Sequence, residues 1–147
     1  MSRLVKPMLF ASPEECERAF YEAMEHADAE AMGDLWLQDD DVCCVHPGAP
    51  RIVGYQAVRA SWATILAGGG MQIHTLARRA FESATLAVSN LIEEIVVQQG
   101  GGPQVVHVLA SNAFVKTPAG WKMVMHMGVA APQGQAVEVE SPGGTVH

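Results

Sequence analysis

The segment DVCCVHP at residues 41–47 places two adjacent cysteines shortly before a histidine. Thiolate and imidazole groups bind zinc, and a thiol beside an imidazole can act as a nucleophile. In a strand, however, successive side chains point to opposite faces, so Cys43 and Cys44 do not converge on one metal. Cys44 and His46 share a face, but a spacing of roughly 6.6 Å along the strand is too long for a direct thiol–imidazole hydrogen bond. We interpret both cysteines as small buried hydrophobic residues.

Two roles are open for His46, which lies at the end of the strand because Pro47 follows it. It lines a pocket as a proton carrier, or it bonds a backbone carbonyl group at the strand end. A zinc site made of Cys44, His46 and a further histidine such as His107 is a third alternative. We expect no bound metal and no cofactor.

His126 is the second candidate proton carrier and lies between two methionines in GWKMVMHMG. Regular alternation places Trp121, Met123 and Met125 on one face of this strand and His126 on the other. The apolar row suits a core or a pocket lining, which would direct His126 toward a subunit interface. A site role and an interface position both stay open for His126.

Polar side chains also interrupt two apolar strands. Asn112 either holds adjacent strands together or offers its amide to a ligand. Glu93 and Glu94 are neighbours, so one of them lies on each face of the sheet. A partly buried carboxylate with a raised pKa can carry a proton in enolisation or dehydration. The alternative is an ion pair with Arg78 or Arg79 on the neighbouring strand.

Aromatic and thioether side chains could wall an apolar pocket around these polar groups. The predicted ligand-binding residues are Tyr21, Trp36, Trp62, Asn112, Met123 and Met125, and the predicted catalytic residues are His46 and His126.

The elements that must position these residues are helices first and strands afterwards. Ser12, Pro13 and Glu15 are typical of a helix start, and apolar residues then recur at helical spacing to residue 27. Asp28 can cap a second, shorter helix, and a third is expected over 55–67. A short strand at 41–46 precedes four long ones at 71–82, 84–98, 104–117 and 121–131. This order predicts an α+β domain with helices on one face of an antiparallel sheet.

Composition sets further bounds on the 147-residue chain. Its length suits one domain, which we place at residues 1–132, followed by a polar Gly/Pro-rich tail at 133–147 of a composition typical of disordered segments. A net charge of −7 argues against nucleic acid, and no apolar stretch is long enough to span a membrane. The beginning of the sequence lacks signal-peptide features, so we expect a cytoplasmic protein with free thiols. Strands that are apolar on both faces indicate a sheet that packs against a second subunit.

Four motifs together resemble the SnoaL-like branch of the nuclear-transport-factor-2-like superfamily over about residues 10–132. They are CVHPG, GYQAVRASWATIL, ASNAFVK and GWKMVMHMG, in this order. The resemblance implies a cone-shaped barrel in which a strongly curved antiparallel or mixed sheet wraps around three N-terminal helices. It also implies a pocket between helices and sheet, and a homodimer through the convex sheet face. Members close to this branch often carry consecutive histidines where this chain has only His126.

The residues and the resemblance together predict a cofactor-free pocket protein that binds a small, largely apolar or aromatic molecule. If it is an enzyme, the expected reaction is an isomerisation, a cyclisation or a dehydration by acid/base chemistry. The alternative is a dimerisation or interaction module with a vestigial pocket. A titratable group beside a cavity would favour the pocket protein. A pocket filled by Met and Trp side chains would favour the interaction module.

Overall fold

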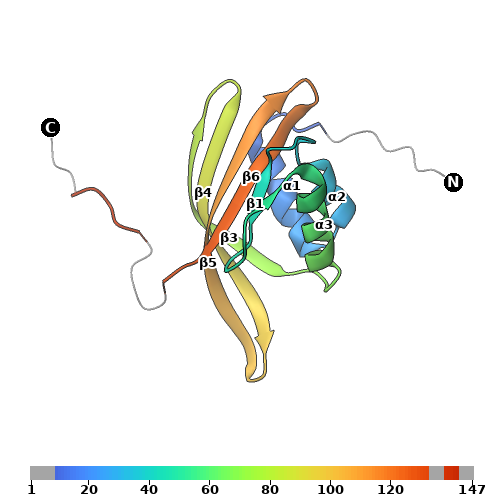
Figure 1. The fold of residues 1–147 in the computed structure, drawn as a ribbon. Coiled ribbons are helices and arrows are strands. Elements are labelled where there is room, and N and C mark those ends of the chain that lie inside the picture. Colours follow the sequence, from blue (N-terminus) through green and yellow to red (C-terminus); the bar gives the residue numbers. More distant parts are fainter. Residues whose placement is uncertain (1–8, 133–137, 143–147) are drawn as a thin grey trace.

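The computed structural model describes residues 9–132 and 138–142 of the chain. Figure 1 shows the three helices gathered on one face of a curved sheet. The elements in chain order are α1 (Pro13–Glu25), α2 (Ala29–Asp34), β1 (Cys43–Val45), β2 (Ile52–Val53), α3 (Tyr55–Leu66), β3 (Gln72–Glu82), β4 (Leu86–Gln99), β5 (Gly102–Thr117) and β6 (Gly120–Ala130).

The helix starts follow from capping chemistry, as the sequence predicts. The Ser12 hydroxyl oxygen accepts a hydrogen bond from the Glu15 backbone N–H at 3.1 Å, and the Glu15 carboxylate accepts one from the Ala11 N–H at 2.9 Å. The Asp28 carboxylate caps α2 by accepting from the Ala31 N–H at 3.0 Å. These bonds satisfy N–H groups that the first helical turn leaves unpaired.

The six strands form one mixed sheet in the order β2-β1-β6-β5-β4-β3. β1 runs parallel to β6, and the other neighbouring pairs are antiparallel. The sheet curls around the helices without closing, since β2 and β3 remain as its edges. The predicted α+β fold with a strongly curved sheet is therefore confirmed. β2, a strand of two residues, is not among the strands that the sequence predicts.

An irregularity in β6 changes which of its residues face the helices. Pairing with β5 shifts between Ala113 and Phe114, so that Val124 is an extra residue in β6. A β-bulge of this kind reverses the alternation beyond it. As a result Met123 and His126 both face the helices, at 0% and 2% exposure, whereas Met125 faces outward at 40%. Because of this bulge, the placement of His126 on the interface side, which assumed regular alternation, is wrong.

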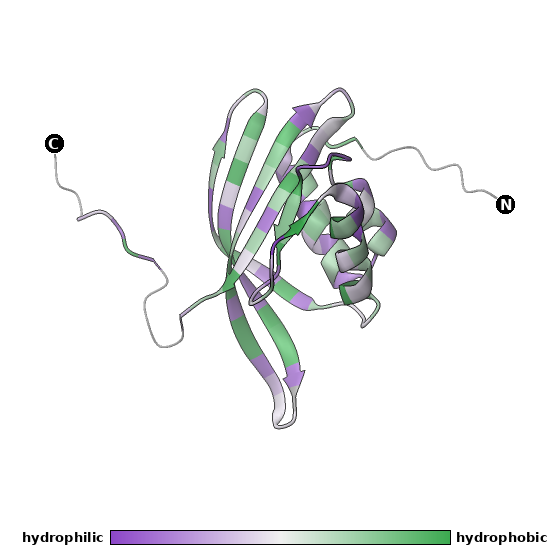
Figure 2. Ribbon diagram, viewed as in Figure 1, coloured by the Kyte–Doolittle hydropathy of each residue, from purple (hydrophilic) through white to green (hydrophobic). Residues whose placement is uncertain are grey.

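The outer face of the sheet is apolar over much of its width, and Figure 2 shows hydrophobic positions recurring along its strands. The strand registers align two apolar rows across this face. We call them the outer apolar rows; they consist of Phe81, Val88, Ala113, Met125, Cys43 and Val53, and of Leu76, Ile92, Leu109 and Val129. A polar row with Arg79, Asn90 and Ser111 runs between them. No described helix covers this face (Figure 1).

The opposite, inner face packs against the helices to form the core. Its largest fully buried side chains include Trp36, Phe20, Phe114, Met32 and Met123. The predicted tail at 133–147 lies mostly outside the described residues. In its described part, 138–142, the Glu138 carboxylate pairs with the Arg79 guanidinium at 3.1 Å on the molecular surface.

Candidate functional site

Polar side chains lie buried between α1 and the inner face of the sheet. We call this set the inner polar network; it consists of Glu17, Tyr21, Ser89, Glu93, Asn112 and His126, none more than 8% exposed. α1 supplies Glu17 and Tyr21 on the same side, one helical turn apart. The sheet supplies the other four, and the pairing of Ser89 with Asn112 and of Asn112 with His126 aligns three of them in one row across β4, β5 and β6.

Asn112 lies at the centre of the network and uses its amide fully. The Asn112 Nδ2 group donates to the Glu17 Oε2 atom at 2.9 Å and to the Tyr21 hydroxyl oxygen at 3.1 Å. The Asn112 Oδ1 atom lies 2.6 Å from the His126 Nδ1 atom. The Asn112 amide therefore joins α1 to two strands. It has a structural role and is at the same time part of a buried polar cluster.

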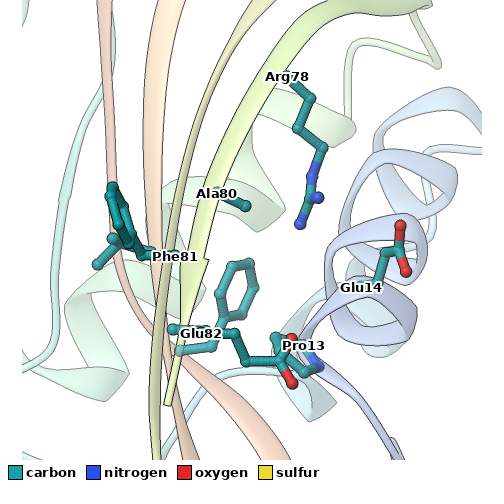
Figure 3. A pocket seen from close by; sticks show the side chains of 9 residues that line it. Pro13, Glu14, Arg78, Ala80, Phe81 and Glu82 are labelled. Carbon is teal, nitrogen blue, oxygen red and sulfur yellow. The ribbon is translucent and has the colours of Figure 1, made fainter.

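The Glu17 side chain accepts hydrogen bonds from three donors. The Arg78 Nε–H donates to Glu17 Oε1 at 2.6 Å, and both the Ser89 hydroxyl and Asn112 Nδ2 donate to Oε2. Figure 3 shows the Arg78 side chain extending from β3 toward α1. A bulge in β3 accounts for this direction, since the register shifts between Leu76 and Arg79 and Ala77 has a φ of 53°.

The predicted ion pair between Glu93 or Glu94 and Arg78 or Arg79 does not form. Arg78 binds Glu17 instead, and Arg79 binds Glu138. Glu94 pairs with His107 at 3.1 Å on the outer face. The bulge in β3 is the physical reason for the difference at Arg78, because it turns this side chain toward α1 and away from the neighbouring strand.

Glu93 is 3% exposed and accepts a hydrogen bond from the Tyr21 hydroxyl at 2.7 Å. Among the described residues, no cation pairs with it. Burial raises the pKa of Glu93 to about 7; the nearby Glu17 carboxylate acts in the same direction and the Tyr21 hydrogen bond in the opposite one. Burial likewise raises the pKa of the Tyr21 hydroxyl well above its usual range. Glu93 is thus poised to exist in both protonation states near neutral pH.

His126 is a neutral imidazole at neutral pH. Burial lowers its pKa to about 3, and the nearby His46 acts in the same direction. The ring contacts Phe20 and Trp62, with centroid distances of 4.9 and 5.9 Å. A neutral imidazole here serves as a hydrogen-bond partner more readily than as a base, because protonating it in this environment is unfavourable.

His46 follows the end of β1 and also contacts the Trp62 ring. Its Nε2 atom lies 2.7 Å from the Ser61 hydroxyl of α3, and its ring meets Trp62 edge-on at 4.8 Å. Burial lowers the pKa of His46. The imidazole also lies 3.8 Å from the Cys44 sulfur, so the expectation that these two side chains are too far apart is wrong. The backbone spacing does not account for the length of the His46 side chain. The hydrogen bond to Ser61 orients the His46 ring toward Cys44.

Cys44 nevertheless remains an inert thiol, because burial raises its pKa to about 12. Within the described ranges 9–132 and 138–142, no group of three His, Cys, Asp or Glu residues could hold a metal ion.

The remaining predicted ligand-binding residues divide between the core and the outer face. Trp36, Trp62 and Met123 are buried on the helix side, whereas Met125 lies in the outer apolar rows. A backbone bridge joins Trp36 to Met123, and the Trp36 Nε1–H finds no hydrogen-bond partner among the described residues. The structure therefore brings five of the six predicted residues to the inner side and separates Met125 from them.

A cavity and a groove lie at the two ends of α1. A cavity of about 70 Å³ lies beside Arg78 at the start of α1, with Pro13, Glu14 and Phe81 in its lining (Figure 3), and has room for about two water molecules. A larger open groove of about 530 Å³ lies at the other end of α1 and is lined by Glu25, His26, Met71, Gln72, Ile73, His74, Glu94 and Val96.

Sequence reasoning missed Glu17, Ser89 and Ser61, and it placed Arg78 differently. Helical spacing carried a usable signal for Glu17, since it precedes Phe20 by three residues and Tyr21 by four on a face that must pack. Ser89 and Ser61 carried none, because isolated serines are common at exposed positions.

Comparisons with known proteins agree with this architecture. A family model described as a SnoaL-like domain matches residues 14–132. No curated protein sequence matches the chain. None of the helices in the described part of the chain is long and apolar enough to cross a membrane.

Solved structures of two kinds are similar to the chain. One, from Thiobacillus denitrificans, is named as a calcium/calmodulin-dependent protein kinase type II association domain; identity is 29%, the TM-score is 0.77, and coverage is 85% of this chain and 99% of that one. Another, from Streptomyces avermitilis, is named as a dehydratase of the NTF2-like family, with 30% identity, a TM-score of 0.71 and coverage of 79% and 91%. The CaMKII hub of S. rosetta, at 17% identity and a TM-score of 0.67 over 82% and 98%, shares the fold.

Proposed function

The chain belongs to the SnoaL-like domain family, and from this premise we propose that it binds a small, largely apolar or aromatic molecule against the inner polar network. The observation that carries the proposal is Glu93, a glutamate buried to 3% exposure with a tyrosine hydroxyl as its partner and no cation among the described residues. Burying such a group without a cation lowers stability, and perturbed carboxylates of this kind gather at functional sites.

Glu93 is suited to carry a proton in isomerisation, cyclisation or dehydration. A carboxyl group with a pKa of about 7 can accept a proton from a carbon acid and return it at neutral pH. Tyr21 would orient the carboxyl group through its 2.7 Å hydrogen bond. The similarity to a protein named as a dehydratase supports this class of chemistry.

We propose that the larger groove is the entrance toward Glu93. Ile73 lines the groove, is 6% exposed and pairs directly with Ile95 on β4. Glu93 lies two residues from Ile95 on the same face, a distance of about 7 Å along the strand. A volume of about 530 Å³ falls within the range of small-molecule sites. We propose that the ligand enters here, between the end of α1 and the start of β3.

His126 and His46 keep candidate roles at the far side of the network. His126 would offer a neutral ring nitrogen to the ligand, and Asn112 would position that ring. His46 would act through Trp62, since its own Nε2 atom contacts Ser61. Trp36, Trp62 and Met123 would form apolar walls.

We also propose that the outer apolar rows bind a second copy of the chain. Several of their side chains are substantially exposed, including Phe81 at 83% and Val129 at 48%. Such a face is unusual on a protein that stays monomeric. A homodimer in the cytoplasm is the expected state.

A second candidate function is an assembly module with a vestigial pocket. Trp36, Met32 and Met123 fill much of the interior, and each is at most 2% exposed. The similarity to proteins named as kinase association domains and hubs favours the same alternative.

Binding and exchange measurements distinguish the two functions. Ligand-observed NMR with phenol and acetophenone at millimolar concentration tests the site, and deuterium incorporation into the acetophenone methyl group in D₂O tests proton transfer. Binding and exchange that Glu93→Gln abolishes are expected if the ligand lies in the pocket, whereas Glu22→Gln, at an exposed position of α1 outside the groove, should retain both. Absence of binding, with a stable dimer by light scattering, would favour the assembly module.

A further inference from the structure

We infer that Arg78, Glu17 and Asn112 form a directional hydrogen-bond relay that fixes the tautomer of His126 and leaves its Nε2 atom as a hydrogen-bond acceptor. The ligand class that follows is a molecule with a hydroxyl or N–H donor at this position. The ligand part of this inference rests on the proposed function, and the tautomer part stands without it.

The relay begins at Arg78, whose guanidinium can only donate hydrogen bonds. Its Nε atom lies 2.6 Å from Glu17 Oε1, and the Arg78 side chain is one-third exposed while that of Glu17 is almost fully buried. Both Glu17 oxygens accept hydrogen bonds, Oε1 from the Arg78 guanidinium and Oε2 from the Ser89 hydroxyl. Glu17 therefore presents an obligatory acceptor, its Oε2 atom, to the sheet.

The second step sets the orientation of the Asn112 amide. The two ends of an amide group differ, because the nitrogen donates and the oxygen accepts. Only the nitrogen can face Glu17 Oε2, at 2.9 Å, and its second hydrogen meets the Tyr21 oxygen at 3.1 Å. The Tyr21 hydroxyl hydrogen is already directed to Glu93 Oε2, so the Tyr21 oxygen is the acceptor for Asn112. The reverse orientation of Asn112 would set its oxygen against the Glu17 carboxylate.

The third step reaches His126. With its nitrogen committed to α1, Asn112 turns Oδ1 toward the His126 Nδ1 atom at 2.6 Å. A bond of this length needs a hydrogen, which only His126 can supply. His126 therefore carries its proton on Nδ1, and because the ring is neutral, Nε2 carries a lone pair. A partner on one ring nitrogen determines what the other nitrogen offers, as in histidine metal ligands.

The site therefore accepts a hydrogen bond at His126 Nε2. A phenol, enol or amide N–H would satisfy this atom, whereas an ether oxygen placed against it would leave two lone pairs in opposition. A buried acceptor without a donor costs enough to change affinity by about tenfold or more. Glu17, Arg78 and Asn112 are positioning residues in this account, since they act through His126.

The tautomer itself is measured by ¹⁵N NMR of histidine-labelled protein, with the His126 signals assigned by their loss in His126→Phe. The expected result is a protonated Nδ1 and an unprotonated Nε2 atom. A protonated Nε2 atom in the wild-type chain would overturn the inference.

Glu17→Gln supplies a sharper test, because the glutamine amide must turn its oxygen to Arg78. Its nitrogen then faces Asn112, whose own amide must reverse and present its nitrogen to His126 Nδ1. We expect the proton of His126 to move to Nε2 in this variant. Ser89→Ala is the matched control, since it removes a donor to the same Glu17 oxygen and leaves an acceptor facing Asn112. The control should keep the Nδ1 proton. Retention of the Nδ1 proton in folded Glu17→Gln would contradict the relay; if that variant does not fold, the wild-type tautomer decides.

The ligand part is tested with phenol and anisole, which differ in the hydroxyl hydrogen. The wild-type chain should bind phenol about tenfold or more tightly than anisole, and Glu17→Gln should lose that preference. Equal binding of both probes would overturn the ligand assignment. Binding of neither, with the expected tautomer, would contradict the proposed function and leave the relay standing. Binding of phenol together with a protonated His126 Nε2 atom would refute the relay and leave the proposed function standing.

Discussion

Replacing Glu93 by glutamine removes the ionisable group from the inner polar network and keeps its shape and its acceptor for the Tyr21 hydroxyl. Glu93 has a folded-state pKa of about 7 against an ordinary value of 4.5. Between these two pH values the folded chain holds a proton that the unfolded chain has released. The contribution of Glu93 to stability is therefore fully present below pH 4.5 and is lost as the pH rises through about 7.

The magnitude follows from the two pKa values. At about 1.4 kcal/mol per pH unit, ionising Glu93 in the folded chain lowers the free energy of unfolding by about 3 kcal/mol at pH 8. At pH 5 the corresponding penalty is below about 1 kcal/mol. Glu93→Gln avoids the penalty, so we expect the variant to gain stability relative to wild type as the pH rises from 5 to 8.

Urea denaturation at pH 5, 6, 7 and 8, at one fixed protein concentration, measures this difference. Glu94→Gln is the matched control, because Glu94 is the adjacent residue and its partly exposed carboxylate contacts His107 at 3.1 Å. The control should change stability by less than about 1 kcal/mol at each pH. A Glu93→Gln effect that is the same at pH 5 and pH 8 would refute the argument that Glu93 is protonated in the folded chain.

Further predictions concern the histidine, the outer face and the core. His126 has a folded pKa of about 3 against an ordinary 6.5, so its contribution to stability is present above pH 6.5 and is lost as the pH falls toward 3; urea titrations of His126→Asn should show a weaker acid dependence than wild type, and an unchanged dependence would argue against a neutral buried ring. Val129→Glu should convert the proposed dimer to a monomer in light scattering, whereas Val139→Glu, at a position 93% exposed, should not; a dimer that survives Val129→Glu would exclude this face as the interface. Phe114→Ala should cost about 3–5 kcal/mol in chemical denaturation, since Phe114 is fully buried, and a loss below about 1 kcal/mol would contradict its place in the core.

The fold could be predicted from the sequence because its local signals agree with each other. Ser12, Pro13 and Asp28 mark helix starts by capping chemistry that needs no tertiary context. The long alternating strands after residue 70 could only form a sheet, and their order after three helices restricted the layers. β2 escaped prediction because two residues are too few to carry a periodic pattern.

The candidate site was predicted only in part, since bulges and long side chains decide its geometry. Asn112, Tyr21 and Trp62 were identified as site residues from their types. The faces of Met125 and His126 were assigned wrongly, because one extra residue at Val124 reverses the alternation. Arg78 was likewise misplaced by the bulge at Ala77. A single sequence contains no signal for such insertions, which depend on how neighbouring strands pair.

The proton-carrier role of Glu93 is tested most directly by its ¹³C carboxyl signal in glutamate-labelled protein, assigned by its loss in Glu93→Gln and followed through a pH titration with and without phenol. We expect this signal to titrate near pH 7, and we expect saturating phenol to shift both its position and its midpoint. A midpoint near the ordinary glutamate value of 4.5, or a signal that phenol does not move, would contradict the claim that Glu93 is the proton carrier of a small-molecule site.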